Sequence, residues 1–349
     1  MLARMNYLTH IQSPGCGSEL YGFMKPKTTY RVLVSTDLGG DPDDIQSLVH
    51  LLHYSDILKI EGILSTTGPG STPRAALIRE WVQRVDLDYL RARGCPALMR
   101  ESEILSVVKQ GATTAGAPCS GADTEGSRWL VERANASDPE NQGRPLWVLV
   151  WGSLTDVAQA LHDAPDIADH IRIYAIGSSN TTNDPESRDY VFAGMREHWP
   201  HLWWIENGIL PRFSHDTFRG YYLGGEQNGE WGNAAFIEHV IRGRGTTHDG
   251  MFDEKLGDAF PVATWPEGVL KEGDTPTFLY LLSPVVGGVG DVDDPTCESW
   301  GGQFHCPSPH QYPNYYTDLN APAEVCQATI NKWRVAYLSD WKQRWLRYG

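Results

Sequence analysis

Short apolar runs alternate with amphipathic segments over residues 30–205 of the chain. Tyr30–Ser35 predicts a strand, and Asp44–Leu52 predicts a helix because its apolar residues recur at helical spacing. The same order returns in Ile60–Ser65, a predicted strand, and in Pro73–Val85, a predicted helix with proline in its first turn. Strands that alternate with helices indicate an α/β fold with a parallel sheet.

The alternation continues through the middle of the chain. Leu146–Val150 is a continuous apolar run, as expected of a strand that is buried on both faces. The next predicted elements are helix Thr155–Leu161, strand Ile171–Ile176, helix Ser187–Trp199 and strand Leu202–Ile205. We therefore predict a mostly parallel central sheet flanked by helices. Ligands of such sheets bind at the carboxyl ends of the strands.

The pattern weakens after residue 210. Residues 211–266 are rich in Gly, Asn, Trp and His, which indicates a cap-like insertion. The later predicted helices are Asn233–Arg242, Thr275–Leu282 and one from about Pro322 to Trp345. We predict an N-terminal extension over residues 1–28 and a single domain over residues 29–349, which ends in an aromatic segment.

Composition narrows the range of partners. The formal net charge is −15 and Lys and Arg form no cluster, which argues against a nucleic acid partner. The sequence contains no run of the ~18 apolar residues that a membrane helix needs. Of the six cysteines, Cys297 and Cys306 flank a Gly-rich loop and could pair, or all could be free thiols. The compartment stays open, with a secreted or periplasmic one slightly favoured, and a homo-oligomer is compatible with the sequence.

The sharpest chemical signal is a group of four aspartates, Asp37, Asp41, Asp43 and Asp44, directly after the first predicted strand. Carboxylates this close repel one another unless protons or a cation neutralise them. Oxygen ligands of this kind suit Ca²⁺ or Mg²⁺. Capping of the following helix by Asp43 or Asp44 is the structural alternative, but a cap needs one acid and not four. The loop therefore predicts a metal site.

This loop resembles the N-terminal metal motif of the nucleoside hydrolase family, Asp-Thr-Asp-x-Gly-x-Asp-Asp. Ser35 stands in place of the first Asp, and two extra residues precede the Asp43-Asp44 pair. That variant is similar to the nucleoside hydrolase-like family of uncharacterised and cellulose-associated proteins. Further matches are the run TDxxxDPDDxxSLxxLL and the segments Glu61-Gly62-Ile63, Pro145 to Gly152, and Lys271 to Pro276. The resemblance implies a nucleoside hydrolase-like fold.

The resemblance also implies roles for matching residues. Asp37, Asp44 and Asp274, with the backbone carbonyl of Trp151, would hold Ca²⁺, and Asp43 would be the general base that deprotonates the attacking water. Trp151 precedes Gly152 to Asp156, which resembles the family's Gly-Pro-Leu-Thr-Asn segment, and its side chain could equally be a core aromatic. The His that usually precedes the late aspartate is replaced by Gly273. Asp274 could also cap a helix, which is compatible with binding a metal.

Several polar residues at predicted strand ends are candidates for binding substrate. They are Asp41, Thr67, Asn180, Asn183, Glu206, Asn207 and Glu272. For Asn183 the alternative is turn chemistry in Asn183-Asp184-Pro185. His248-Asp249 and His215-Asp216 could be acid–base pairs near a leaving group, although lone histidines in polar loops are more often solvated.

One departure from the family bears on the substrate. Where the family has a Gly-Asn pair that contacts the sugar, this chain has Thr66-Thr67-Gly68-Pro69, which weakens the case for a ribonucleoside. The chain also has 13 Trp and 15 Tyr, which favours a small carbohydrate because sugar faces stack on aromatic rings. We expect a metal-dependent glycoside hydrolase that cleaves a furanosyl O- or N-glycosidic bond with metal-activated water. The alternatives are a nucleoside N-ribohydrolase and a non-catalytic carbohydrate-binding protein.

Overall fold

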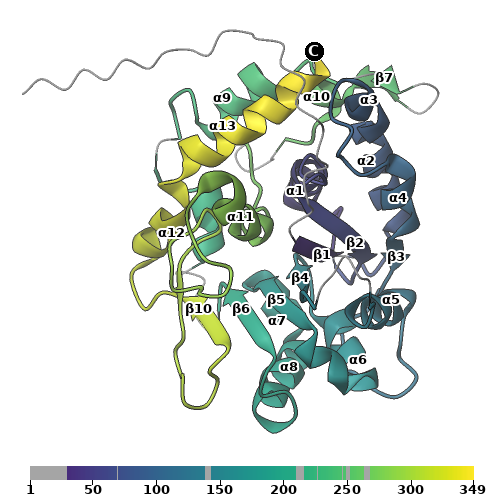
Figure 1. The fold of residues 1–349 in the computed structure, drawn as a ribbon, viewed down its shortest axis with the longest axis vertical. Helices are drawn as coiled ribbons and strands as arrows, with labels where there is room; N and C mark the ends of the chain where they lie inside the picture. The colour runs from purple at the N-terminus through teal and green to yellow at the C-terminus, as the bar shows by residue number, and fades with distance from the viewer. Residues whose placement is uncertain are drawn as a thin grey trace, which may run out of the picture.

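The computed structural model describes residues 30–68, 70–137, 143–209, 216–225, 227–245, 247–248, 252–262 and 268–349. Its centre is an eight-stranded sheet with the strand order β3-β2-β1-β4-β5-β6-β10-β9 (Figure 1). The strands are β1 (Tyr30–Thr36), β2 (Leu58–Ser65), β3 (Val108–Gln110), β4 (Leu146–Val150), β5 (Ile171–Ile176), β6 (Trp203–Asn207), β9 (Phe304–His305) and β10 (Tyr315–Asp318). All neighbouring strands are parallel except β9 and β10. The predicted mostly parallel sheet is confirmed.

Helices cover both faces of this sheet (Figure 1). Packed on one face are α1 (Pro42–Leu52), α2 (Ala75–Val85), α11 (Pro276–Leu282) and α13 (Arg334–Trp345). Packed on the other are α5 (Glu125–Ala134), α6 (Thr155–Asp163) and α8 (Pro185–Glu197). Val32 and Val34 of β1 belong to the first core and Leu33 to the second, because successive strand side chains point to opposite faces.

The remaining elements are short or peripheral. They are helices α3 (Leu87–Ala92), α4 (Glu101–Ser106), α7 (Ser179–Asn183), α9 (Asn233–Phe236), α10 (Leu256–Ala259) and α12 (Ala323–Asn331), and the separate strand pair β7 (Thr247–His248) and β8 (Phe252–Lys255). In the part of the chain that the structure describes, no helix is long and apolar enough to span a bilayer.

The strand order reverses direction at β1. β2 and β3 extend the sheet on one side of it, and β4, β5 and β6 extend the sheet on the other. The loops that leave the carboxyl ends of β1 and β4 therefore diverge, and doubly wound sheets bind ligands in the crevice between such loops. Asp37 directly follows β1 and Trp151 directly follows β4. The fold thus places two of the predicted metal residues at its switch point.

Some predicted elements differ from the observed ones. The C-terminal helix predicted from about Pro322 to Trp345 is two helices, α12 and α13, which are separated at Lys332-Trp333. Arg334 turns inward at this break, and its Nη1 donates to Oδ1 of Asn233 at 2.8 Å. The single helix predicted over Asn233–Arg242 is α9 followed by a π-helical turn at Ile237–Ile241.

Two segments for which the hydrophobic pattern predicted no helix or strand contain regular structure. The aromatic C-terminal segment supplies β10, which pairs with β6 and was not predicted. The described part of the predicted cap holds a 3₁₀ helix, η2 (Thr217–Tyr221), close to the carboxyl end of the sheet. The predicted N-terminal extension, residues 1–28, lies outside the described residues.

Candidate metal centre

Three carboxylates from two distant segments meet at the carboxyl edge of the sheet. Asp43 and Asp44 lie in the first turn of α1, and Asp274 lies just before α11. Each offers one carboxylate oxygen, and these oxygens lie within 4.8 Å of one another. The Oδ2 atom of Asp274 is buried and has no hydrogen-bond partner among the described residues. Since an unpaired buried carboxylate is costly, this oxygen is suited to a cation.

The start of α1 directs the two aspartates toward the cavity. Asp41 is the N-cap residue, and its Oδ1 accepts a hydrogen bond from the backbone N–H of Asp43 at 3.4 Å. Asp41 also pairs with the ammonium group of Lys271. The capping role considered for Asp43 or Asp44 therefore falls to Asp41. Asp44 accepts a hydrogen bond from the hydroxyl of Thr36 at the end of β1.

Asp37 is packed closely between two glycines. A Cβ atom on Gly68 would lie 2.5 Å from the Cβ of Asp37, and one on Gly152 would lie 3.0 Å from it. Arg74 fixes the adjoining backbone, because its Nη1 donates to the carbonyls of Asp37 at 2.7 Å and Leu38 at 3.1 Å. Gly68 is thus required for the close approach of two loops, independently of any contact with a sugar.

Burial raises the pKa of four aspartates at this edge of the sheet, Asp37, Asp43, Asp44 and Asp274. Burial raises the pKa of Asp37 to about 6 and, with repulsion from Asp41, that of Asp43 to about 7. The pKa values of Asp44 and Asp274 lie well above the usual range because of burial and the charges of neighbouring aspartates. Either protons or a cation must neutralise such a group, and carboxylate oxygens are the ligands that Ca²⁺ and Mg²⁺ prefer.

The Trp151 carbonyl faces the same edge of the sheet. It accepts a hydrogen bond from Nδ2 of Asn180 at 2.7 Å and, as a carbonyl, keeps a second lone pair. The Trp151 side chain is 1% exposed, and its Nε1 donates to the hydroxyl of Thr277 at 2.8 Å. The indole is therefore a core aromatic, as the alternative interpretation allowed.

A cavity of about 400 Å³ opens over the cluster. The predicted site residues that line it are Asp37, Asp41, Asp43, Asp44, Asn180, Asn183 and Asp274. Its lining also includes Phe218, Arg219, Tyr222 and Lys271, which sequence reasoning missed. Lys271 belongs to a motif that the sequence singled out. The other three come from η2 or directly follow it, and their only sequence signal is the spacing of Asp216 and Arg219.

Phe218, Arg219 and Tyr222 form a second wall of the cavity, distinct from the aspartates, and hydrogen bonds hold two of these side chains in place. Nε of Arg219 donates to buried Asp216 at 2.7 Å, and Nη1 donates to the hydroxyl oxygen of Tyr222 at 2.9 Å. Phe218 occupies the space beside Gly273: a Cβ there would lie 3.0 Å from Oδ2 of Asp43 and 3.5 Å from the Phe218 ring. The ring thus packs against the position where the family's histidine side chain would begin.

Four of the predicted substrate residues are placed elsewhere. Both carboxylate oxygens of Glu206 accept hydrogen bonds from Arg188, at 3.0 and 2.7 Å. Asn207 is fully buried and bonds Tyr174 and the backbone of Phe218. The Thr67 hydroxyl donates to the carbonyl of Thr113 at 3.3 Å.

Glu272 is the fourth of these residues, and it is fully buried beside His50, with 2.8 Å between its Oε2 and Nδ1 of the imidazole. None of the four lines the cavity. Their geometry favours structural roles.

Among the side chains that the structure describes, no member of the histidine pairs and no cysteine lines this cavity. His215 and Asp249 lie outside the described residues, whereas Asp216 is held by Arg219. Cys297 and Cys306 are free thiols in the structure, so the pairing considered for them is not present.

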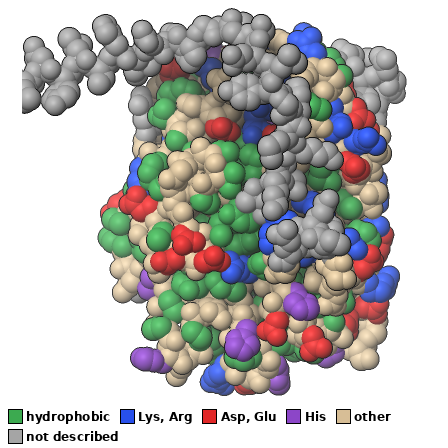
Figure 2. Space-filling view, viewed as in Figure 1, with side chains coloured by type: hydrophobic (Ala, Val, Ile, Leu, Met, Phe, Trp, Pro, Cys, Tyr) green, Lys and Arg blue, Asp and Glu red, His purple; other side chains and the backbone are tan. Residues whose placement is uncertain are grey.

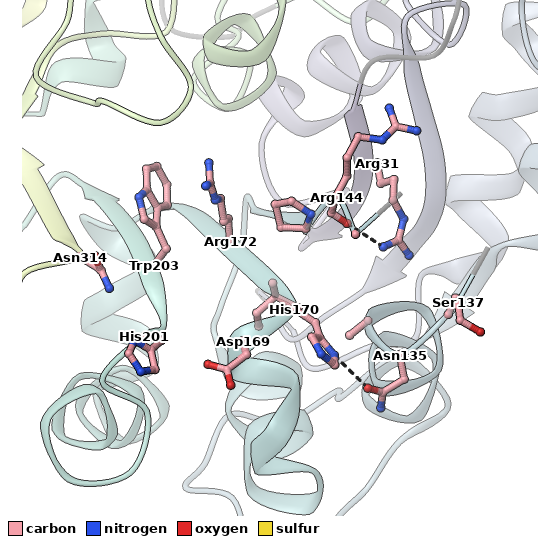
Figure 3. Close-up of a pocket in the computed structure, with 15 residues that line it drawn as sticks. Arg31, Asn135, Ser137, Arg144, Asp169, His170, Arg172, His201, Trp203 and Asn314 are labelled. Atoms are coloured by element: carbon pink, nitrogen blue, oxygen red, sulfur yellow. Dashed lines mark hydrogen bonds between the residues drawn. The ribbon is translucent and has the colours of Figure 1, made fainter. Parts of the chain in front are cut away.

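A larger cavity, of about 750 Å³, lies at the amino-terminal edge of the same sheet (Figure 3). Two arginine side chains that line this cavity are already bound to carboxylates. Arg31 binds Glu61 through Nε at 3.0 Å and Nη2 at 2.8 Å, and Arg172 pairs with Asp293 at 2.5 Å. It brings together none of the predicted site residues. On the face drawn in Figure 2, the described Lys and Arg side chains are scattered among acidic ones.

A doubly wound sheet with an aspartate cluster at its switch point is the arrangement that the resemblance to the nucleoside hydrolases implied. The sequence matches the family described as "Cellulose-binding Sde182, nucleoside hydrolase-like domain" over residues 31–304. The chain belongs to this family, as its motifs predicted. No curated protein matches the sequence.

Three solved structures show the same fold. A nucleoside hydrolase-related hypothetical protein from Saccharophagus degradans, associated with carbohydrate metabolism, is 23% identical with a TM-score of 0.66, and the match covers 92% of this chain and 72% of that one. The effector protein XOO4466 is 13% identical with a TM-score of 0.55 and coverages of 93% and 95%. The type III effector XopQ, complexed with adenosine diphosphate ribose, is 15% identical with a TM-score of 0.51 and the same coverages.

Proposed function

We propose that this chain is a metal-dependent hydrolase of furanosyl glycosidic bonds, O- or N-linked. The observation that carries the proposal is the convergence of Asp43, Asp44 and Asp274 on a polar cavity, with a buried and unpaired oxygen on Asp274. Every candidate ligand is a hard oxygen atom, and this donor set fits Ca²⁺.

Asp37, Asp44, Asp274 and the carbonyl of Trp151 would hold the ion. A divalent cation bound there lowers the pKa of a water molecule and orients the hydroxyl oxygens of a sugar. The raised pKa values of these acids fit this role, because a cation can replace the protons that the cluster otherwise retains.

Asp43 is the proposed general base. It lines the cavity beside the proposed ligands, so it can accept a proton from the water that attacks the anomeric carbon. The leaving group departs as positive charge develops on the sugar ring, as in other glycoside hydrolases. The departing oxygen or nitrogen takes a proton from solvent, and the proton that Asp43 gains is released to solvent after turnover.

The wall formed by Phe218, Arg219 and Tyr222 is the proposed position of the leaving group. Arg219 and Tyr222 supply N–H and O–H donors, which stabilise an oxygen that gains negative charge. Asn183, which lines the same cavity, is proposed to bind sugar hydroxyls together with Asn180. These donors favour an O-linked furanoside or an oligosaccharide end, and the carbohydrate association of the Saccharophagus protein supports this choice.

A nucleoside N-ribohydrolase is the second candidate, favoured by the family description. The polar residues after β2 do not support it. The hydroxyl of Thr66 donates to Asp156 at 2.8 Å and that of Thr67 donates to Thr113, so neither is directed to the cavity. A binding protein without catalysis would have no need of a base beside the proposed ligands.

A release assay tests the proposal. Purified protein is incubated with aryl furanosides, furanosyl oligosaccharides, inosine and uridine, with and without EDTA. We expect EDTA-sensitive release from a furanoside and a lower kcat/KM on both nucleosides. Efficient cleavage of a nucleoside alone would establish the second candidate. Sugar binding without release from any compound would establish the binding protein.

A further inference from the structure

One face of α1 carries three fully buried polar side chains, Gln46, Ser47 and His50. They lie one, three and four residues apart, so they share one side of the helix. All three point toward the segment that carries Asp274, residues 271–275. Buried polar groups of this kind are expected to be paired, and each has a partner in that segment.

The contacts follow the segment almost residue by residue. Oε1 of Gln46 accepts from the backbone N–H of Lys271 at 2.8 Å. Nδ1 of His50 lies 2.8 Å from Oε2 of Glu272. The hydroxyl of Thr275 lies 2.9 Å from that of Ser47 and 3.0 Å from Oε2 of Glu272. Asp274 is therefore bracketed by residues that are bonded to α1.

The His50–Glu272 pair is enclosed by aromatic rings. The imidazole of His50 stacks on Trp341 of α13, with ring centroids 3.8 Å apart, and meets the edge of Phe278 at 5.2 Å. Both members of the pair are 0% exposed. Neither lines the cavity, so the pair cannot contact a substrate there. Its position between α1 and the Asp274 segment gives it a different role.

We propose that the buried contacts between α1 and residues 271–275, with His50–Glu272 at their centre, set the position of Asp274 relative to Asp43 and Asp44. The inference rests on the proposed metal site and assigns Glu272 as a positioning residue. A cation binds more tightly where its ligands already hold the required spacing. Partners that orient metal ligands typically contribute about 10- to 100-fold in metal affinity.

The test is calcium affinity, measured by titration calorimetry on chelator-stripped full-length protein. Glu272→Met keeps a similar size but removes both hydrogen bonds, and we expect it to weaken Ca²⁺ binding about 10- to 100-fold. Glu272→Gln keeps a hydrogen-bonding group beside His50, and we expect affinity within about threefold of the parent. The matched control is Glu61→Met. It breaks the buried Arg31–Glu61 pair far from the cluster, so it should lower the melting temperature and leave Ca²⁺ affinity unchanged.

Should Glu272→Met fail to fold, Thr275→Val removes the hydroxyl from the same contacts at little change in shape. It should then weaken Ca²⁺ binding severalfold. Calcium affinity that stays within twofold of the parent in Glu272→Met or Thr275→Val, while melting temperature falls as in the control, overturns the positioning role. Absence of Ca²⁺ binding by the parent protein itself would instead overturn the proposed metal site.

Discussion

Asp43 and Asp44 are adjacent in sequence, yet the proposed function gives them different roles, Asp43 as general base and Asp44 as metal ligand. We expect Asp43→Asn to keep the fold and Ca²⁺ binding but to lose about 10²–10⁴-fold in kcat, because an amide cannot accept the proton. Asp44→Asn should instead weaken Ca²⁺ binding. Kinetics on the furanoside found in the release assay, paired with calcium titration, separates the two. Parental turnover by Asp43→Asn would assign water activation to another group.

Tyr222 offers a second test at the scale of one residue. Its hydroxyl oxygen accepts from Arg219, so its own O–H is free to donate into the cavity. We expect Tyr222→Phe to lower kcat/KM about 5-fold, the cost of one hydrogen bond worth about 1 kcal/mol, and to leave Ca²⁺ affinity unchanged. Tyr190→Phe is the control, because that hydroxyl bonds His162 outside the cavity. Equal kcat/KM in both variants would remove Tyr222 from the site.

The cluster of aspartates could be predicted from sequence, because four carboxylates in one short loop repel one another and few structural roles would need all four. The second wall could not. Arg219 belongs to a short 3₁₀ helix with no hydrophobic repeat, and Tyr222 directly follows it, so both reach the cavity only through tertiary contacts. Glu206 and Asn207 were placed correctly at a strand end, but sequence could not show that Arg188, Tyr174 and Phe218 already bond them.

At the scale of elements, the loop after β2 packs against the loop after β1. We expect Gly68→Ala to destabilise the protein by about 1–3 kcal/mol, as overpacking does. We also expect it to lower Ca²⁺ affinity, because the new Cβ would displace Asp37. Gly116→Ala is the control, since a Cβ there meets nothing within 4 Å. Thermal melts and calcium titration measure both effects, and a Gly68→Ala protein with parental calcium affinity would contradict the assigned packing.

The elements that could be predicted are those with a strong period. β4 and β5 were predicted with their observed bounds because buried parallel strands are continuous apolar runs. β10 was missed because its residues, Tyr315–Asp318, form a short aromatic and polar segment that becomes a strand only by pairing with β6. The break between α12 and α13 was missed because Arg334 is held there by tertiary contacts.

For the whole molecule, the acidic cluster predicts how stability depends on pH. The folded-state pKa values of Asp37, about 6, and Asp43, about 7, lie above the unfolded value of about 3.9. The folded state thus keeps protons that the unfolded chain releases. Stability that is present below about pH 4 is therefore lost as pH rises through about 7.

We accordingly expect the melting temperature in EDTA to fall between pH 4 and pH 8, and excess Ca²⁺ to restore it at pH 8. Asp274→Asn removes one charge from the cluster and should flatten the decline in EDTA. Calorimetric melts of both proteins across this range measure the effect. If the melting temperature of the parent in EDTA does not fall more steeply with pH than that of Asp274→Asn, charge repulsion in the cluster does not lower the stability of the folded state.

The central claim, that a cation held by these aspartates supports glycoside hydrolysis, is tested most directly by a single titration. Chelator-stripped protein is supplied with increasing equivalents of Ca²⁺, and the rate of aglycone release from an aryl furanoside is followed. We predict no release without Ca²⁺ and a rate that rises to a plateau at one Ca²⁺ per chain. A rate that is independent of Ca²⁺, or absence of release at every loading, would contradict the claim.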